Sequence, residues 1–243
     1  MAPTLSTKQW VLSHLIVAGL LCLAVLQWWQ IGTQPLRFTA LNVGQGDALL
    51  IQTPEHHTIL IDAGPDGTVV DELGKQLGFF DSTIDLFILS HPHRDHYGGI
   101  MDVLAKYSVK KVMLTGIQNN DPMYGGFLKT LREKSIPLTF PQADHDLKIG
   151  PNLFLDFIFP FKGQNLLGHA FKNKNNSSVV ARLVRVGPRG QEPLAILEGD
   201  AEQEEETQIL RNGADVRAGV LKVGHHGSRT SSTPAYLAAV DPK

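Results

Sequence analysis

The sequence of 243 residues has little cysteine and no large excess of charge of either sign. Its one cysteine, Cys22, excludes an intramolecular disulfide and a cysteine-based zinc cluster. The 22 basic and 24 acidic side chains argue against a strongly basic protein that coats nucleic acid. Of the residues, 42% are hydrophobic and 19% are charged. This composition excludes a disordered chain, a collagen-like fibre and a polytopic membrane protein. Histidine, in contrast, is abundant, with ten residues.

Charge is almost absent from the N-terminal part, where Lys8 is the one charged side chain among residues 1–36. Residues 10–31 form a run of 22 mostly apolar residues, and about 20 span a bilayer as a helix. Tryptophans mark both edges of the run, as interfacial aromatic side chains do: Trp10, Trp28 and Trp29. We therefore expect one transmembrane helix, with a cleaved signal peptide or a buried core helix as the alternatives.

The apolar run divides the chain into two parts. We expect residues 1–35 to form a tail, the transmembrane helix and a linker, and residues 36–243 to form one domain. Lys8 and the α-amino group lie on one side of the span, and Arg37 lies on the other. By the positive-inside rule, this predicts a single-pass protein of the cell membrane whose large domain is extracytoplasmic.

Short apolar runs separated by glycine and proline turns follow the linker and predict β-strands. These runs are 36–43, 47–52, 57–62, 85–90, 111–115, 153–159, 178–186, 194–198 and 219–223. Helical patterns cover 68–78, 98–107, 124–135 and 201–212. Strands come first and then mix with helices, which favours one α/β domain. The acidic run Glu202–Glu206 is interpreted as the solvated first turn of the last helix, where negative charge suits the helix dipole.

A predicted buried strand leads directly into residues 90–96, which hold three histidines and an aspartate. Two-residue alternation in an extended backbone would put the imidazoles of His91 and His93 on the same side. Asp95 and His96 follow as the chain turns, and they can face a second ion. Divalent transition metals take imidazole and carboxylate ligands together, which favours a metal site over a surface histidine-rich loop.

Two later strands also end in residue types that bind metals. The strand at 194–198 is followed by Gly199 and Asp200, whose carboxylate can bridge two ions or cap the helix that follows. The strand at 219–223 is followed by His225 and His226. We predict His225, which is nearer the strand end, as the metal ligand. His226 is then free to act as an acid or to bind substrate.

These segments resemble the metallo-β-lactamase superfamily, whose pattern is His-x-His-x-Asp-His after one strand, Gly-Asp after a later strand and His after another. More narrowly, residues 38–243 resemble the C-terminal domain of ComEC-type DNA-uptake (competence) proteins. Six segments carry this narrower resemblance: Leu41–Asp47, Ile59–Gly64, Ser90–His93, Asn175–Ser178, Leu197–Asp200 and Leu221–Ser232. The resemblance implies an αββα sandwich with metals between the two sheets at the strand ends.

The resemblance also implies a role for each candidate side chain toward two divalent metal ions. His91 and His93 would hold the first ion, and Asp200 would bridge to the second. The second ion would be held by three side chains: Asp95, His96 and His225. Asp62 would support the histidine segment from behind. Asp47 would play a similar role or simply stabilise its own turn.

Three features depart from the superfamily pattern. Where a third histidine usually serves the first ion, this chain has residues 175–178, Asn-Asn-Ser-Ser. His145 and His169 lie too early in the chain, in loop-like sequence, so that asparagine or water would complete a weaker site. Asn42 replaces the aspartate with which the subgroup opens. The family continues with a further strand and helix beyond Lys243, so we expect a C-terminally truncated domain.

The implied function is metal-dependent hydrolysis of phosphodiester bonds of DNA during natural transformation. Two adjacent ions lower the pKa of a bound water and stabilise the charge that develops. The nitrogen and oxygen ligands suit manganese or zinc, and the missing histidine favours manganese. We predict Asp95 and His226 as catalytic residues, with His226 protonating the leaving oxygen, and Ser228 and Arg229 as substrate-binding residues. Phosphate groups could also meet three basic clusters: Lys110/Lys111, Lys172/Lys174 and Arg182/Arg185/Arg189.

The expected partners are DNA, in single-stranded form, the membrane and other components of a DNA-uptake channel. Because the chain is slightly acidic, binding of DNA is expected to be weak and salt-sensitive. Two other functions fit the same residues. The ions would serve equally to hydrolyse another ester or an amide, such as a lactam or thioester. Alternatively, the domain would be a non-catalytic module that guides DNA.

Overall fold

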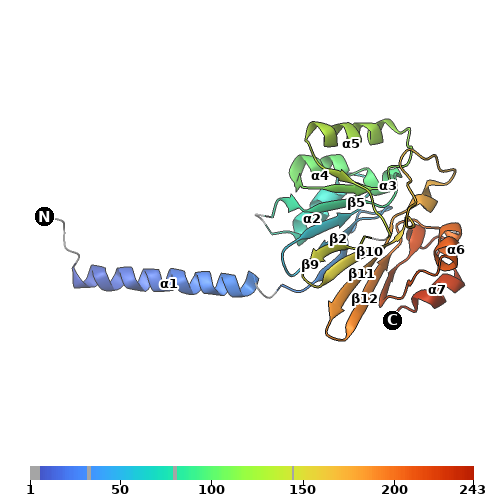
Figure 1. The fold of residues 1–243 in the computed structure, drawn as a ribbon. Helices are drawn as coiled ribbons and strands as arrows, with labels where there is room; N and C mark the ends of the chain where they lie inside the picture. The colour runs from blue at the N-terminus through green and yellow to red at the C-terminus, as the bar shows by residue number, and fades with distance from the viewer. Residues whose placement is uncertain (1–5, 32–33, 79–80, 144) are drawn as a thin grey trace.

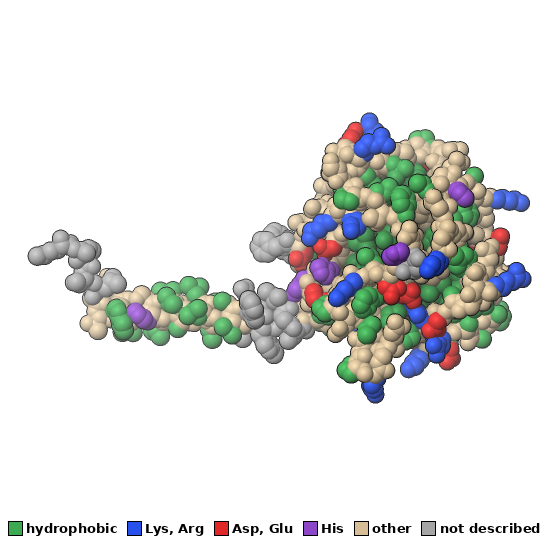
Figure 2. Space-filling view, in the orientation of Figure 1, with side chains coloured by type: hydrophobic (Ala, Val, Ile, Leu, Met, Phe, Trp, Pro, Cys, Tyr) green, Lys and Arg blue, Asp and Glu red, His purple; other side chains and the backbone are tan. Residues whose placement is uncertain are grey.

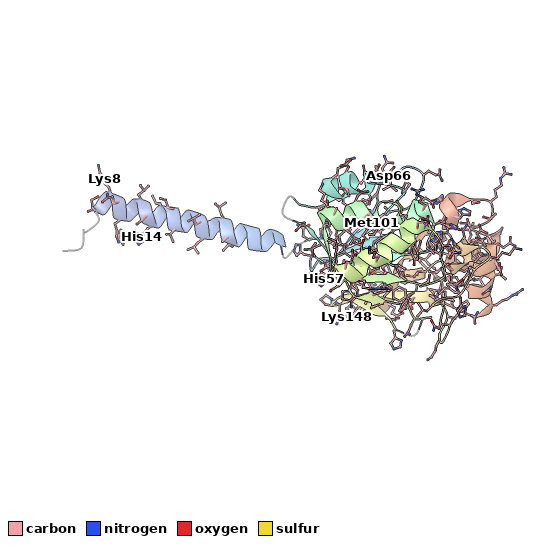
Figure 3. The ribbon with its side chains drawn as sticks, turned by 90° about the horizontal axis from the view of Figure 1, so that it is seen from above. Lys8, His14, His57, Asp66, Met101 and Lys148 are labelled. Carbon is pink, nitrogen blue, oxygen red and sulfur yellow. The ribbon has the colours of Figure 1, made fainter. Side chains whose placement is uncertain are left out.

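The structure is a computed structural model that describes most of the chain. The described residues are 6–31, 34–78, 81–143 and 145–243, without the side chains of 26–31. Trp28 and Trp29, which we expected at a membrane interface, therefore lie outside the described side chains. The first helix, α1 (Thr7–Ile31), stands apart from a layered domain, with Lys8 near its far end (Figures 1 and 3).

Helix α1 is apolar over its described surface. The 19-residue stretch Thr7–Val25 is long and apolar enough to cross a membrane, and none of it is buried. Figure 2 shows its side chains as a largely hydrophobic surface, on which Leu15 and Leu20 are exposed. Because the described side chains of α1, residues 7–25, contribute nothing to the core, the alternative of a buried core helix does not agree with the structure. One apolar N-terminal helix is present, as predicted.

The domain consists of two facing sheets covered by helices (Figure 1). The first sheet has, in spatial order, strands β1 (Arg37–Ala40), β2 (Leu49–Gln52), β3 (Thr58–Ile61), β5 (Leu86–Leu89), β7 (Val112–Leu114) and β8 (Leu138–Thr139). The second has β13 (Val220–Lys222), β12 (Gly190–Leu197), β11 (Val180–Gly187), β10 (Leu153–Phe159) and β9 (Leu147–Gly150). A short parallel pair joins β4 (Thr83–Ile84) and β6 (Ser108–Val109).

Branched apolar side chains fill the space between the sheets. Ile59 and Ile88 of the first sheet pack in one cluster with Leu155 of the second. Successive strand residues point to opposite faces, so Leu60 and Phe87 are buried on the outer face of the first sheet. Continuous apolar runs therefore form strands that are buried on both faces.

Helices cover the outer face of each sheet. The helices are α2 (Thr68–Gln76), α3 (Arg94–Tyr97), α4 (Ile100–Lys106), α5 (Pro122–Glu133), α6 (Gln203–Arg211) and α7 (Pro234–Val240). Leu73 of α2 and Phe127 of α5 pack in one cluster with Phe87 of β5. On the other side, Ile209 of α6 and Tyr236 of α7 pack in one cluster with residues of β11 and β12. The predicted αββα sandwich is confirmed.

The structure differs from the sequence-based elements in several places. The predicted helix 98–107 is shortened to α4, and an unpredicted short helix, α3, precedes it, with Gly98 and Gly99 between the two. The acidic run that we interpreted as solvated is partly buried, because Glu205 and Glu206 of α6 face the interior. Glu206 accepts hydrogen bonds from the backbone N–H groups of Ser232 and Thr233, and it thereby fixes the start of α7.

Candidate metal centre

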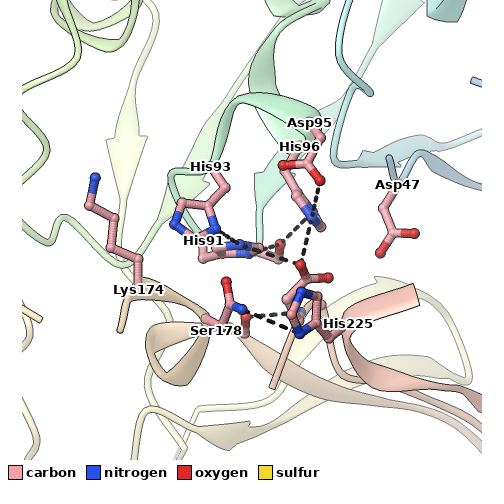
Figure 4. A network of polar contacts seen from close by, with 12 residues as sticks. Asp47, His91, His93, Asp95, His96, Lys174, Ser178 and His225 are labelled. Atoms are coloured by element: carbon pink, nitrogen blue, oxygen red, sulfur yellow. Dashed lines mark hydrogen bonds and ion pairs between the residues drawn. The ribbon is translucent and has the colours of Figure 1, made fainter. Parts of the chain in front are cut away.

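The polar side chains singled out in the sequence gather where several strands end. β3 and β5 run parallel in the first sheet, and β12 and β13 run parallel in the second. Asp62 directly follows β3, Ser90 follows β5, and Asp200 lies three residues beyond β12. Because the carboxyl ends of parallel strands meet at one edge, residues far apart in sequence become neighbours there (Figure 4).

His91 and His93, called the His91 pair below, lie next to each other. The backbone of His93 is extended, with φ −100° and ψ 148°. The Nε2 atom of His91 is 3.0 Å from the Nδ1 atom of His93. His91 is completely buried, whereas His93 is partly exposed. Two ring nitrogens at this distance either share a proton or bind one cation together.

Four side chains form a second cluster, the Asp95 group: Asp95, His96, Asp200 and His226. One potential ligand atom from each lies within 4.8 Å of all the others. The Oδ2 atom of Asp200 is 3.2 Å from Nε2 of His96 and 3.6 Å from Nε2 of His226. Oδ1 of Asp200 and Nε2 of His96 are buried without a hydrogen-bond partner among the described residues. Two imidazoles, two carboxylates and unpaired buried lone pairs fit a divalent metal ion.

Asp62 holds His96 in place from behind. Its Oδ2 atom is 2.8 Å from Nδ1 of His96, and its two oxygens accept hydrogen bonds from the N–H and Oγ–H of Ser90. A carboxylate at Nδ1 places the ring proton there and leaves Nε2 free for a metal, as around metal-binding histidines in general. Asp62 thus stands where the sequence analysis expected it.

Asp47 does the same for His226. Its Oδ1 atom is 3.2 Å from Nδ1 of His226, and its Oδ2 atom forms an ion pair with Lys222. The Nε2 atom of His226 then faces Asp95, at 3.3 Å from Oδ2. Of the two roles expected for Asp47, the contacts favour support of a site histidine.

Burial and neighbouring charges shift the pKa values of these histidines in opposite directions in the two clusters. Burial alone would lower the pKa of His96, but the carboxylates of Asp62 and Asp200 outweigh burial and raise this pKa to about 10. Hydrogen bonds with Asp47 and Asp95 raise the pKa of His226 to about 9. Burial lowers the pKa of His91 well below its usual value, and neighbouring imidazoles lower it further. The Asp95 group thus attracts positive charge, while His91 is neutral, the state in which an imidazole binds a metal.

His225 lies beside the Asp95 group rather than in it. Its Nδ1 atom is 2.9 Å from Oε1 of Glu202 and 3.2 Å from Oγ1 of Thr230. The structure therefore does not bring together Asp95, His96 and His225 as expected, and His226 takes that place. The cause is a left-handed turn after β13, in which His225, His226 and Gly227 have φ values of 45°, 52° and 76°.

Ser228 and Arg229, predicted to bind substrate, face away from the imidazoles in their described contacts. Ser228 donates its N–H to the carbonyl of His225, and its Oγ atom is 3.1 Å from Oγ1 of Thr230. Arg229 is exposed and lines a groove with Glu202 and α6. The geometry gives neither residue a contact with the Asp95 group.

The segment that replaces the family's third histidine lies next to the site. It forms the short 3-10 helix η1 (Lys174–Ser177), in which Asn175 is buried. Asn175 donates from Nδ2 to Glu202, at 2.9 Å, and its Oδ1 atom has no hydrogen-bond partner within the described structure. His145 and His169 are both exposed in loops, as the sequence analysis expected.

Sequence reasoning missed two residues of this region. Glu202 was assigned to a solvated helical turn, yet it contacts His225 and Asn175. Ser90 was quoted only as part of a motif, yet its hydroxyl is 2.7 Å from Asp62 and 3.1 Å from His91. A signal for Glu202 was available, because it stands where the preceding loop enters α6 and the chain turns back toward the site.

The chain is similar to several known proteins. The chain is 27% identical over 253 residues to ComE operon protein 3 of Bacillus subtilis, covering 96% of this chain and 31% of that protein. It is 27% identical over 207 residues to Competence protein ComA of Neisseria gonorrhoeae, covering 84% of this chain and 26% of that protein. The chain thus spans about a third or less of the length of these relatives. Among solved structures, metallo-beta-lactamase SMB-1 is 15% identical, with a TM-score of 0.48, over 84% of this chain and 89% of that one.

The sequence profile of a single family covers most of the domain. The profile of the metallo-beta-lactamase superfamily matches residues 41–243, which include both histidine-bearing segments and all the strands from β2 onward. This match agrees with the two facing sheets and with the cluster of imidazoles and carboxylates where their strands end. This chain therefore belongs to the metallo-beta-lactamase superfamily.

Proposed function

We propose that this chain is a membrane-anchored, metal-dependent hydrolase that cleaves phosphodiester bonds of DNA during DNA uptake. The observation that carries the proposal is the Asp95 group, a partly buried set of two imidazoles and two carboxylates with unpaired ligand atoms. The competence protein among the relatives supports DNA as the substrate. The proposed DNA is single-stranded, and other components of an uptake channel are the proposed protein partners.

We propose two divalent ions, manganese or zinc, one at the Asp95 group and one at the His91 pair. Asp200 lies between these places, because its Oδ2 atom is 3.2 Å from Nε2 of His96 and 3.8 Å from Nε2 of His91. When bound, such ions supply Lewis-acid stabilisation of a phosphate in reaction and lower the pKa of a water. His226 is assigned to the Asp95 group as a metal ligand, in place of the role predicted from the sequence, which was to protonate the leaving oxygen.

The residues of the chain prepare this site for a phosphodiester. Asp62 and Asp47 orient His96 and His226, so that both present Nε2 to the same space. Lys174 is the basic residue proposed to meet the phosphate, because it lies beside the His91 pair (Figure 4) and its charge lowers the pKa of His93, after the larger effect of burial. Three other members of the basic clusters form ion pairs with carboxylates: Lys110, Arg182 and Arg185.

The test is a cleavage assay on the full chain in detergent, with manganese or zinc added. We expect hydrolysis of a single-stranded oligonucleotide that is lost with EDTA and with His96→Ala, but kept in the matched control His169→Ala. A lactam and a thioester are assayed in parallel. Turnover of either in place of DNA would support the other hydrolase function. Bound metal and bound DNA without any cleavage would support a guiding module instead.

A further inference from the structure

We propose that His225 supplies the third imidazole to the ion at the His91 pair, so that the adjacent residues His225 and His226 serve different ions. The inference rests on the proposed function only in assuming an ion at each place. It answers a specific question, because the chain has residues 175–178, Asn-Asn-Ser-Ser, where the superfamily pattern has a third histidine.

The contacts of His225 prepare it for a metal. All its described side-chain hydrogen bonds are at Nδ1, and the strongest is with Oε1 of Glu202 at 2.9 Å. A carboxylate at Nδ1 fixes the proton on that nitrogen and leaves Nε2 with a free lone pair. His96 with Asp62 and His226 with Asp47 have this same arrangement. His225 is therefore built like the other ligands, although no role in the Asp95 group is open to it.

Glu202 is itself held firmly. It accepts hydrogen bonds from Nδ2 of Asn175 at 2.9 Å and from Nδ2 of Asn173 at 2.8 Å. The segment that lacks the third histidine therefore acts on the site indirectly, because its asparagines fix the carboxylate that orients His225. This accounts for the burial of Asn175, whose amide would otherwise be costly to place in the interior.

The position of His225 completes a row of imidazoles around Asp200. Ring centroids are 4.7 Å apart for His93 and His91, 4.2 Å for His91 and His96, 5.3 Å for His96 and His226, and 6.1 Å for His226 and His225. The N–H of His225 donates to the carbonyl of Gly199, directly before Asp200. In Figure 4, His225 lies below His91, whereas Asp95 and His96 lie above it. His225 can therefore approach the ion at the His91 pair from the side that Asp95 and His96 leave free.

The strained backbone at His225 and His226 sets the directions of their two imidazole rings. Left-handed φ values at two consecutive histidines cost free energy, of order 1–3 kcal/mol each, and persist where the structure around them requires it. Here they turn the two rings 62° apart. One imidazole can then face the Asp95 group while its neighbour faces the His91 pair.

Counting bound manganese in the full chain in detergent tests this inference without any assay of activity. We expect two ions on the wild-type chain, and one site weakened at least tenfold by either His225→Ala or His93→Ala. The double variant His93→Ala/His225→Ala should still keep one ion, because both changes affect the same site. In contrast, His225→Ala/His226→Ala should weaken both sites. His169→Ala is the matched control.

A milder variant and a check of folding make the result unambiguous. Glu202→Gln should weaken the same site by about tenfold, because orienting carboxylates contribute on that order. Unchanged circular dichroism in EDTA shows that each variant folds. Two tight ions on His225→Ala, or fewer than two on the wild-type chain, would overturn the inference. If every variant binds the expected number of manganese ions but the chain does not cleave DNA, the inference stands and only the proposed function is overturned.

Discussion

Single carboxylates decide how the imidazoles of this site present their nitrogens. Asp62, Asp47 and Glu202 each contact an Nδ1 atom, and each comes from a different part of the chain. A histidine alone carries no such information, since either ring nitrogen can bear the proton. The chemistry of the site therefore lies as much in the acidic residues around the histidines as in the histidines themselves.

Glu205 is a buried carboxyl group that has no part in the site, and it should make stability depend on pH. Burial raises its pKa well above 4.5, and nearby Glu198 raises it further. The folded chain therefore holds this proton more tightly than the unfolded chain does. Its contribution to stability is complete below about pH 4.5 and is lost as pH rises. We expect Glu205→Gln to flatten the fall in unfolding free energy as the pH rises above about 4.5.

The measurement is urea unfolding of the full chain in detergent and EDTA at several pH values. Glu204→Gln is the control, because Glu204 is the exposed neighbour of Glu205 on α6. It should leave the pH profile of the wild-type chain unchanged. Parallel profiles for Glu205→Gln and the wild-type chain would show that Glu205 is ionised in the folded state, against this expectation.

At the level of helices and strands, the sequence was informative where strands are buried. β3 and β5 are buried apolar runs, β12 ends in one, and the structure brings the residues that follow these strands together at the strand ends. β8 and β9 were missed because they are short and partly exposed, so that they show no clear alternation. That His226, rather than His225, lies in the Asp95 group could not be predicted for another reason. It depends on a left-handed turn, and nothing in the residue types of a His-His pair predicts positive φ.

The turn after β12 requires glycine at position 199, and this requirement can be tested. The φ of Gly199 is +51°, and a Cβ atom there would lie 2.7 Å from Cβ of Ser90. Gly213 has φ +69° but open space around it. A substitution at Gly213 therefore measures the cost of the left-handed backbone conformation without any steric clash. We expect Gly213→Ala to cost about 1 kcal/mol. Gly199→Ala should cost roughly 2 kcal/mol more, because the added methyl group also overpacks the interior.

Urea unfolding and manganese titration together check this prediction. Gly199→Ala should also weaken metal binding, because the clash with Ser90 displaces the neighbouring Asp200. Gly213→Ala should bind manganese as the wild-type chain does. Equal destabilisation by the two substitutions, with metal binding intact in both, would mean that the turn after β12 has room to adapt.

For the whole molecule, the decisive contrast is between a helix whose one charged side chain is Lys8 and a domain of mixed charge. Figure 2 shows basic and acidic side chains interspersed over the visible face of the domain, while α1 is almost entirely apolar. No broad basic surface is therefore available to hold DNA on that face, and the proposed contacts are local to the site. In the proposed function, a membrane anchor would place such a domain at a surface where DNA arrives, which would lessen its need for long-range electrostatic attraction.

The orientation of this helix is the last prediction, and it depends on very few charges. The 25 residues of α1 extend for about 37 Å at about 1.5 Å per residue, enough to cross a hydrocarbon core of about 30 Å with some tilt. Lys8 and the α-amino group oppose only Arg37 near the span. Alkaline phosphatase, which is active only outside the cytoplasm, is fused after Lys243. We expect membrane-bound activity that falls with Lys8→Glu but not with Lys148→Glu, since charges far from a span have little influence on its orientation. An inactive, membrane-bound fusion would reverse the proposed topology, and an active fusion released from the membrane would favour a cleaved signal peptide.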